Sequence, residues 1–185
     1  AYRDYIAGNL IGQDVTNNGL DLYGKLSLEK LLEGISQGDG VKWIRLLYCY
    51  PTFVTDRLIQ AMADLPKVVK YCDMPIQHTR ERVLRLMRRG ITETRQKDLL
   101  AKMRAEIPGL VMRTTVIAGF PGETDGDADG IVADLAELKF ERLGAFIYSR
   151  EPGTFADGMD GHVDEAVNKE RMDRIMKQQQ GIALA

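Results

Sequence analysis

The sequence LVMRTTVIAGFPGET at residues 110–124 decides the fold, because it places an apolar run directly before a glycine-rich turn. Residues 110–118 have the length and the β-branched content of a buried strand. Thr124 is a residue type that begins helices, and residues 124–138 continue with apolar side chains at helical spacing. A strand, a tight turn and a helix in this order form the repeating unit of parallel α/β sheets.

The same alternation extends along the rest of the chain. Short apolar runs predict four more strands, at residues 9–13, 43–48, 67–76 and 142–148. Amphipathic stretches predict five more helices, at residues 26–35, 55–63, 80–89, 92–107 and 163–180. In the first of these helices, Leu28, Leu31, Leu32 and Ile35 fall on one face at helical spacing, and Thr55 is the predicted N-cap of the second helix. Strands separated by helices predict an α/β fold with right-handed crossovers, as either an open doubly wound sheet or an incomplete barrel.

The composition is that of a soluble globular domain. The 185 residues have a formal net charge of -2, so the overall charge favours no nucleic-acid partner. No apolar run approaches the roughly 20 residues of a membrane-spanning helix, and the first five residues, AYRDY, lack an apolar leader segment. We therefore expect a cytoplasmic protein with no membrane partner. Cys49 and Cys72 lie in separate apolar runs, which predicts buried thiols rather than a disulfide or metal ligands.

Polar residues follow every predicted strand. They are Gln13, Asp14, Thr16, Asn17 and Asn18; Tyr48 and Tyr50; Asp73, Gln77 and His78; Gly119, Gly122 and Glu123; and Tyr148, Ser149, Arg150 and Glu151. In parallel α/β folds, ligands bind at the C-terminal ends of the strands. We therefore expect these residues to line a ligand-binding mouth, although the turns of a purely structural domain have the same residue types.

The turn GFPGET at residues 119–124 is the most specific of these clusters. Gly119 and Gly122 permit positive φ and a close approach of the backbone to a ligand. Amide groups at the start of the following helix suit an anion or a carboxylate. The alternative is a tight turn in which Thr124 only caps the helix. The turn is not a phosphate-binding P-loop, because no Gly-Lys-Ser/Thr sequence follows.

His78, at the end of a predicted strand, suits either general base catalysis or a local hydrogen bond, and Asp73 is placed to orient it or to bind a ligand. His162 lies in a polar loop and is expected to be inert. A basic stretch follows His78, with Arg80, Arg82, Arg85, Arg88, Arg89, Arg95 and Lys97. Its arginines form either a solvated helix face or a contact surface for phosphate or an acidic partner.

Taken together, the strand ends resemble the methylthiotransferase branch of the radical S-adenosylmethionine (SAM) superfamily over nearly the whole chain. Residues 10–16 (LIGQDVT), followed by Gly19, resemble the second barrel strand of that family. Residues 117–124 (IAGFPGET) resemble its fifth strand and are the most specific match. Residues 146–149 (FIYS), with Gly153 and Thr154, resemble its sixth strand and loop.

Three segments favour one branch of this family. Residues 48–52 (YCYPT), 73–78 (DMPIQH) and 113–115 (RTT) resemble the enzymes that modify a ribosomal protein, the RimO type. The transfer-RNA enzymes, the MiaB type, tend to have a serine-proline-histidine sequence at the first segment and a serine in place of His78. The resemblance therefore favours the ribosomal-protein branch.

The resemblance implies a partial, open TIM-like barrel of parallel strands with crossover helices over residues 1–162. Residues 163–185 would then form a helix leading toward a small RNA-binding β domain. The activity implied is cleavage of S-adenosylmethionine at a [4Fe-4S] cluster, followed by methylthiolation of an aspartate β-carbon in ribosomal protein S-twelve, with a second cluster helping to supply sulfur. The partners implied are ribosomal protein S-twelve or the ribosome, with ribosomal RNA contacted through residues 80–95.

The resemblance also assigns individual residues. Those assigned to S-adenosylmethionine are Gln13, Gln77, Gly119, Pro121, Gly122 and Tyr148. Those assigned to substrate approach are Tyr50, His78 and Arg113. Pro152 departs from the family, because a glutamate is typical at that position.

The chain departs from the family more strongly in its metal ligands. It has no C-x3-C-x2-C motif, the first barrel strand with its cluster loop is missing, and so is the amino-terminal domain that holds the second cluster. We therefore expect this chain alone to be inactive and to bind S-adenosylmethionine weakly. The alternatives are a MiaB-type transfer-RNA methylthiotransferase and a non-catalytic module that docks on the ribosome. A lyase or aldolase barrel is disfavoured, because no predicted strand ends in a lysine.

Overall fold

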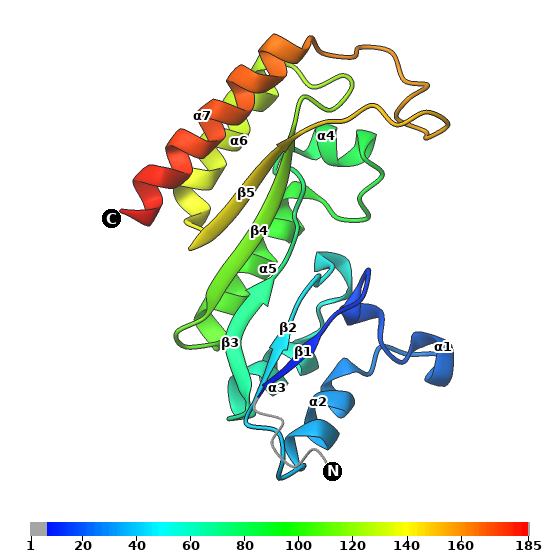
Figure 1. Cartoon of the computed structure of the whole chain (residues 1–185), viewed down its shortest axis with the longest axis vertical. Coiled ribbons are helices and arrows are strands. Elements are labelled where there is room, and N and C mark those ends of the chain that lie inside the picture. The colour runs from blue at the N-terminus through cyan, green and yellow to red at the C-terminus, as the bar shows by residue number, and fades with distance from the viewer. Residues whose placement is uncertain (1–6, 185) are drawn as a thin grey trace. The chain divides into compact units, whose positions relative to one another are not determined.

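A computed structural model describes residues 7–184 of the chain (Figure 1). The expectation that the chain lacks a leader segment rests on its first five residues, which lie outside the described residues. The strands are β1 (Ala7–Leu10), β2 (Trp43–Leu46), β3 (Val68–Asp73), β4 (Val111–Ala118) and β5 (Arg142–Ile147). They are hydrogen-bonded neighbours in the order β1-β2-β3-β4-β5, and the pairs β1–β2, β2–β3 and β3–β4 are parallel. The predicted α/β class with a parallel sheet is confirmed.

The predicted helices are also found, with small shifts at their ends. They are α2 (Leu28–Ser36), α3 (Asp56–Asp64), α4 (Glu81–Leu86), α5 (Glu93–Glu106), α6 (Asp125–Leu138) and α7 (Glu165–Ala183). The single-turn helix α1 (Leu20–Tyr23) and the 3-10 turns Val15–Asn17 and Pro51–Phe53 were not predicted. Such short turns have no apolar periodicity for a sequence pattern to detect. The first strand begins and ends earlier than predicted, and a bend at Gly12 and Gln13 follows it.

The chain forms two compact units, and each unit combines two segments of sequence. The first unit is Ala1–Pro75 with Leu99–Arg113, and the second is Ile76–Asp98 with Thr114–Ala185. The boundary predicted between residues 162 and 163 stays a prediction. Within the second unit, α7 packs against α6 and β5, and these three elements lie side by side in Figure 1.

In the first unit, α2 packs against α3, and α3 packs against β3. Ile44 and Leu46 of β2 are fully buried, as is Leu32 of α2. Thr55 caps α3 as predicted, since its Oγ1 accepts a hydrogen bond from the Leu58 N–H at 3.1 Å. The apolar helix faces therefore cover one face of the strands, which is the usual way in which an α/β layer buries its core.

The helix α2 buries a narrower stripe than the sequence predicts. Leu28 and Leu32 are buried, whereas the side chain of Leu31 is 38% exposed. Leu31 shares the apolar face of α2, but the neighbouring elements cover only part of that face. Ser27 stands at the N-cap position, but its hydroxyl bonds to the Lys25 carbonyl instead of capping the helix.

In the second unit, alternate residues of β4 enter the core. Val116 and Ala118 are buried there, together with Ile131 of α6. Thr124 caps α6 as predicted and forms a reciprocal capping box with Asp127. This cap fixes the point at which the turn after β4 becomes a helix, and so it positions the glycine-rich turn of residues 119–124.

Candidate functional site

The glycine-rich turn after β4 requires both of its glycines. Gly119 has φ 78° and Gly122 has φ 82°, in the left-handed region that side chains disfavour. A Cβ on Gly119 would also collide with the Asn168 side chain of α7. The Gly119 N–H donates to Glu123 Oε2 at 3.0 Å, and the Gly122 N–H donates to the Gly161 carbonyl at 2.8 Å. These two amides are therefore already bonded within the protein, and an anion or a carboxylate at the amides of the helix start stays a prediction.

Glu123 is the central polar group of this turn, and its side chain is almost fully buried. Its Oε1 accepts a hydrogen bond from Arg171 Nη1 at 3.0 Å, and its Oε2 lies 3.5 Å from His78 Nε2. Arg171 also donates to Asp125 at 2.7 Å. A buried carboxylate is costly unless its charge is paired, and Arg171 provides that pairing. Glu123 thus ties the turn to α7 and to the residues that follow β3.

His78 has the carboxylate partner that the sequence did not reveal. The ring is fully buried, and its Nδ1 accepts a hydrogen bond from the Arg80 N–H at 3.0 Å. In the neutral ring the proton then lies on Nε2, which faces Glu123. Asp73 does not orient His78; it accepts a hydrogen bond from Arg113 at 2.9 Å. The predicted substrate contact of His78 stays a prediction.

Gln77 and Tyr148 carry buried polar atoms that have no hydrogen-bond partner among the described residues. These atoms are Gln77 Oε1 and Tyr148 Oη. Gln77 bonds through its backbone to Thr115 and Ile117 on one side of β4, and the Tyr148 N–H bonds to the Ala118 carbonyl. Gln77 also has φ 69°, which is uncommon for a residue with a side chain. An unpaired buried polar group is costly, so a polar ligand that reached these two side chains at the strand ends would be stabilised by bonding to them.

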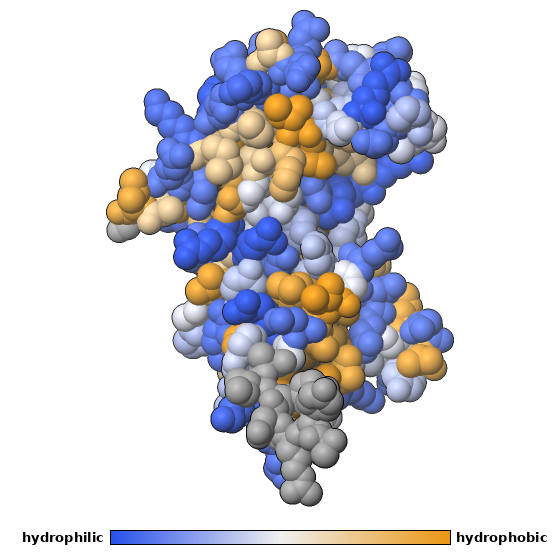
Figure 2. All heavy atoms as spheres, viewed as in Figure 1, coloured by the Kyte–Doolittle hydropathy of each residue, from blue (hydrophilic) through white to orange (hydrophobic). Residues whose placement is uncertain are grey.

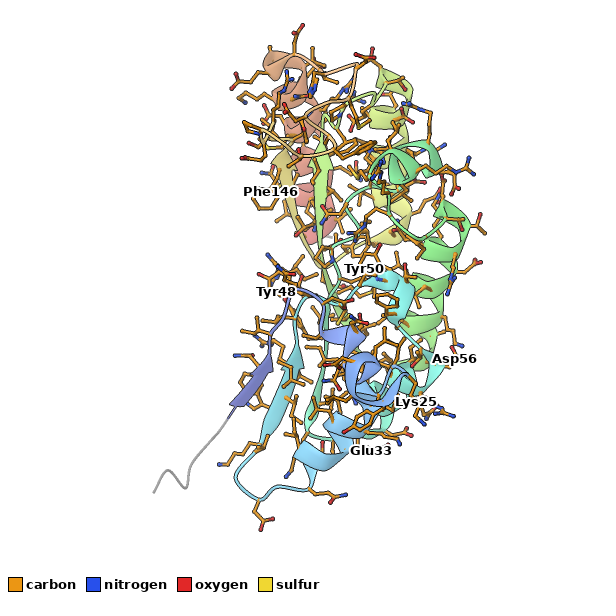
Figure 3. All side chains as sticks on the ribbon, turned by 90° about the vertical axis from the view of Figure 1, so that its right-hand side faces the viewer. Lys25, Glu33, Tyr48, Tyr50, Asp56 and Phe146 are labelled. Atoms are coloured by element: carbon orange, nitrogen blue, oxygen red, sulfur yellow. The ribbon has the colours of Figure 1, made fainter. Side chains whose placement is uncertain are left out.

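In the first unit, the polar residues after β1 and β2 meet as predicted. Thr16 Oγ1 accepts a hydrogen bond from the Tyr50 N–H at 3.0 Å, and Asp14 bonds both to the backbone and to the hydroxyl of Thr16. Figure 3 shows Tyr48 and Tyr50 together in the segment that follows β2. Tyr48 is half exposed and has φ 58°. Gln13 is exposed in the loop after β1.

The predicted site residues therefore fall into two groups. Gln77, His78, Gly119, Pro121, Gly122 and Tyr148 belong to the second unit, and Gln13, Tyr50 and Arg113 belong to the first. Within the second unit, Pro121 is buried between the two glycines of the turn. Within the second unit, the backbones of Gln77 and Tyr148 bond to β4, and Gly119 bonds to Glu123 in the turn that follows β4.

Arg45 of β2 is a candidate functional residue that was not predicted from the sequence. Its guanidinium carbon lies 5.2 Å from the ring centroid of Trp43 and 4.9 Å from that of Tyr71. No carboxylate in the described part of the chain pairs with Arg45, and its Nε is buried without a partner. Burial and the nearby Asp73 raise the pKa of Tyr71. The only sequence signal was a charged residue within an otherwise apolar strand.

The basic stretch after His78 is largely paired within its own unit. Arg80 bonds to Glu93 and approaches Asp134, Arg82 pairs with Asp127, and Arg85 pairs with Glu81. Arg88 instead stacks on the Phe155 ring, 3.4 Å from its centroid. These contacts neutralise much of the positive charge that a phosphate backbone would need.

The two cysteines are buried free thiols, which confirms the prediction. A hydrogen bond with Cys72, together with burial, raises the pKa of Cys49. Among residues 7–184, no group of three or more His, Cys, Asp or Glu side chains is placed to hold a metal ion. In the same range, no helix is both long enough and apolar enough to cross a membrane.

Close relatives match almost the whole length of this chain. It is 49% identical over 177 residues to the ribosomal protein uS12 methylthiotransferase RimO of Anaeromyxobacter sp. (strain K), and 47% identical over 176 residues to that of Desulforamulus reducens. These alignments cover 96% and 95% of this chain, but 38% and 40% of the relatives. The chain thus spans about two-fifths of the length of the curated relatives it matches.

Solved structures share the fold at low sequence identity. Coproporphyrinogen III oxidase (HemN) from Escherichia coli, described as a radical SAM enzyme, has a TM-score of 0.63 and 17% identity over 83% of this chain and 35% of its own. Elp3 from the archaeon Methanocaldococcus infernus has a TM-score of 0.62 and 13% identity, over 97% of this chain and 46% of its own. The family model of the radical SAM superfamily matches residues 5–135, more than half of the sequence. The chain therefore belongs to the radical SAM superfamily.

Proposed function

We propose that this chain is the cofactor-binding core of a methylthiotransferase that modifies ribosomal protein uS12. The observation that carries the proposal is the 47–49% identity to uS12 methylthiotransferases over 95–96% of the chain. The segments YCYPT and DMPIQH favour this branch over the transfer-RNA enzymes. Because the relatives are more than twice as long, the activity belongs to the longer protein, and the present chain supplies its barrel core. We infer that a protein with a ribosomal substrate would act in the cytoplasm.

The second unit has features that fit S-adenosylmethionine. Gln77 and Tyr148 hold unpaired polar atoms beside β4, and a polar ligand would satisfy them. Gly119 and Gly122 set the backbone of the turn between them through their positive φ, and Asn168 occupies the space that a Gly119 side chain would fill. When bound and reductively cleaved, S-adenosylmethionine supplies a radical that removes hydrogen from the substrate carbon. Gln77 and Tyr148 would bind and orient it, and the assignment of Gln13, which belongs to the first unit, stays a prediction.

The described residues do not fit a [4Fe-4S] cluster. Both cysteines are buried in the core of the first unit, and a cluster of this kind needs several thiolates that converge on one point. We therefore assign no cluster ligand to this chain. In the longer protein the ligands would come from residues outside the present sequence.

For the substrate, Arg113 is the group best suited to an aspartate side chain. Its guanidinium is partly exposed and already binds one carboxylate, that of Asp73. A second carboxylate on the exposed side would form the charge-assisted bonds that arginine favours. Tyr50 of the first unit and His78 of the second unit stay separate proposals for substrate contact. A ribosomal RNA contact through residues 80–95 is a weaker secondary proposal, because most of those arginines are already paired.

A graft tests the proposed activity directly. The aligned 177 residues of the Anaeromyxobacter relative are replaced by this chain, and the hybrid is expressed in a strain that lacks its own uS12 methylthiotransferase. We expect mass spectrometry of uS12 to show one added methylthio group, with transfer RNA unchanged. Methylthiolated transfer RNA with unmodified uS12 would instead support the transfer-RNA branch. The proposal is refuted if a soluble hybrid modifies neither uS12 nor transfer RNA while the unaltered relative modifies uS12 in the same strain.

The docking alternative has its own test in the same hybrid. Reversal of charge at Arg82, Arg85 and Arg89 would abolish ribosome binding if these side chains contacted ribosomal RNA. We expect it instead to destabilise the hybrid, because Arg82 is bonded to Asp127 and to the Gly122 carbonyl. Ribosome co-sedimentation, measured together with a thermal melt, separates the two outcomes.

A further inference from the structure

The first unit has a groove between α1 and α2 that no part of the proposed activity uses. Its volume is about 850 Å³. The residues that line it are Asn18, Leu22, Tyr23, Lys25, Ser27, Lys30, Leu31, Gly34 and Ile35. All of them come from one continuous segment, so the groove is formed locally. Figure 2 shows apolar atoms at the edge of the molecule where Figure 1 places α1.

The helix α1 presents apolar side chains without burying any of them. Leu22 is 71% exposed and Tyr23 is 65% exposed. Gly19 before the helix and Gly24 after it both have positive φ, so the turn is fixed at each end by a conformation that favours glycine. A Cβ on Gly19 would collide with Ser27, so the turn is also packed closely onto the start of α2. The protein thus holds two large apolar side chains in a defined position facing solvent.

The helix α2 contributes a second apolar face to this groove. Leu28 and Leu32 account for the buried face, whereas Leu31 and Ile35 line the groove. Gly34 lies between them, and no atom lies within 4 Å of the position that its Cβ would take. A glycine within a helix costs about 0.5–1 kcal/mol relative to alanine. Packing within the chain does not explain why a glycine stands at position 34. The close approach of another backbone to this part of α2 would explain it.

The charged side chains that line the groove are both lysines. Lys25 and Lys30 form no ion pair with any described residue, and both are exposed. Figure 3 shows Lys25 beside α2. An apolar groove with two unpaired cations is complementary to an apolar helix face that has acidic residues along its border. We propose that this α1–α2 groove docks an acidic, amphipathic segment of a partner polypeptide.

The same features disfavour other kinds of partner. A nucleic acid is bound mainly through many phosphate contacts, and two lysines would supply only a small part of that energy. An anionic membrane surface typically attracts clusters of about four to eight basic residues. A peptide helix instead inserts a few apolar anchors into a groove and gains specificity from charges at the border.

The test uses a synthetic helical peptide of about 15 residues, capped at both ends, with leucines on one face and glutamates beside them. Its binding to the chain is measured by fluorescence anisotropy, and the site is located from NMR shifts of residues 18–35. We expect saturable binding that weakens about tenfold in the double variant Lys25→Glu, Lys30→Glu. A peptide with lysines in place of the glutamates should bind that double variant better than it binds the original chain.

Two control variants separate the groove from general effects. Lys42→Glu changes an exposed lysine outside the groove, and Leu184→Asp changes an exposed leucine of the second unit; neither should alter binding. Leu22→Asp should abolish it, and thermal melts should show that all variants stay folded, because the substituted side chains are exposed. Equal affinity for the acidic and the basic peptide would overturn the proposal. So would the absence of saturable binding, or stronger perturbation of residues 18–35 by a single-stranded RNA or by phosphatidylglycerol vesicles than by the acidic peptide.

Discussion

Glu123 Oε1 lies 3.0 Å from Arg171 Nη1, and the two side chains are only 1% and 7% exposed. This ion pair joins the glycine-rich turn after β4 to the long helix α7. Because both charges are withdrawn from water, each depends on the other for compensation. The conformation of the turn thus depends on a residue that lies 48 positions further along the chain.

Replacing Glu123 with glutamine should destabilise the protein strongly. The change leaves Arg171 buried with only Asp125 as a charged partner, and breaking a buried pair of this kind costs about 3 kcal/mol. The matched control is Asp129→Asn, which breaks the exposed pair with Arg174 and should cost less than about 1 kcal/mol. Urea unfolding measures both values. Equal losses in the two variants would show that the Glu123 pair has no special role.

Gly119→Ala should cost more stability than Gly109→Ala. Both glycines have positive φ, but only at Gly119 would the new Cβ collide with Asn168, whereas the space around Gly109 is open. The strain from φ alone is about 1–2 kcal/mol, and the collision adds to it at Gly119. Urea unfolding of both variants measures the difference. The double variant Gly119→Ala, Asn168→Ala should recover part of the loss; no recovery would show that the collision is not the cause.

Tyr148→Phe should have opposite effects on stability and on cofactor binding. The substitution removes a buried hydroxyl that has no partner, so the chain should be unchanged or stabilised by up to about 1 kcal/mol. If that hydroxyl binds S-adenosylmethionine, the KM for this cofactor should rise severalfold in the grafted enzyme. Tyr23→Phe is the matched control and should change neither value, because Tyr23 is exposed. Loss of stability with an unchanged KM would contradict the proposed role.

Asp134 should make stability sensitive to acid. Burial alone would raise its pKa, but hydrogen bonds from Lys97 and Thr79 outweigh this effect and lower the pKa below its ordinary value of 3.8. The stability that Asp134 provides is therefore complete above pH 3.8 and is lost as pH falls through the lowered folded-state value. The free energy of unfolding lost in Asp134→Asn should thus be large at pH 7 and shrink below about pH 4. Urea unfolding at several pH values measures it; a loss that does not depend on pH would contradict this assignment.

Sequence patterns predicted most of the secondary structure because that information is local. The strand at residues 110–118, the Thr124 cap and the Thr55 cap depend on neighbours within a few positions, and all three are found. The burial of Cys49 and Cys72 followed in the same way from the apolar runs around them. The exposure of Leu31 could not be predicted in this way, since periodicity identifies an apolar face but does not show how wide a stripe the neighbouring elements cover.

The sequence by itself determined the class of fold, the family resemblance and the positions of the polar strand ends. Only the tertiary structure decided which of these residues meet. It paired His78 with Glu123 and Glu123 with Arg171, joined Asp73 to Arg113, and brought Arg45 close to the rings of Trp43 and Tyr71. The physical reason is that charge pairing and burial act through space, between side chains brought together by the packing of distant segments. Backbone propensity and capping act through neighbours in sequence and can be read from it directly.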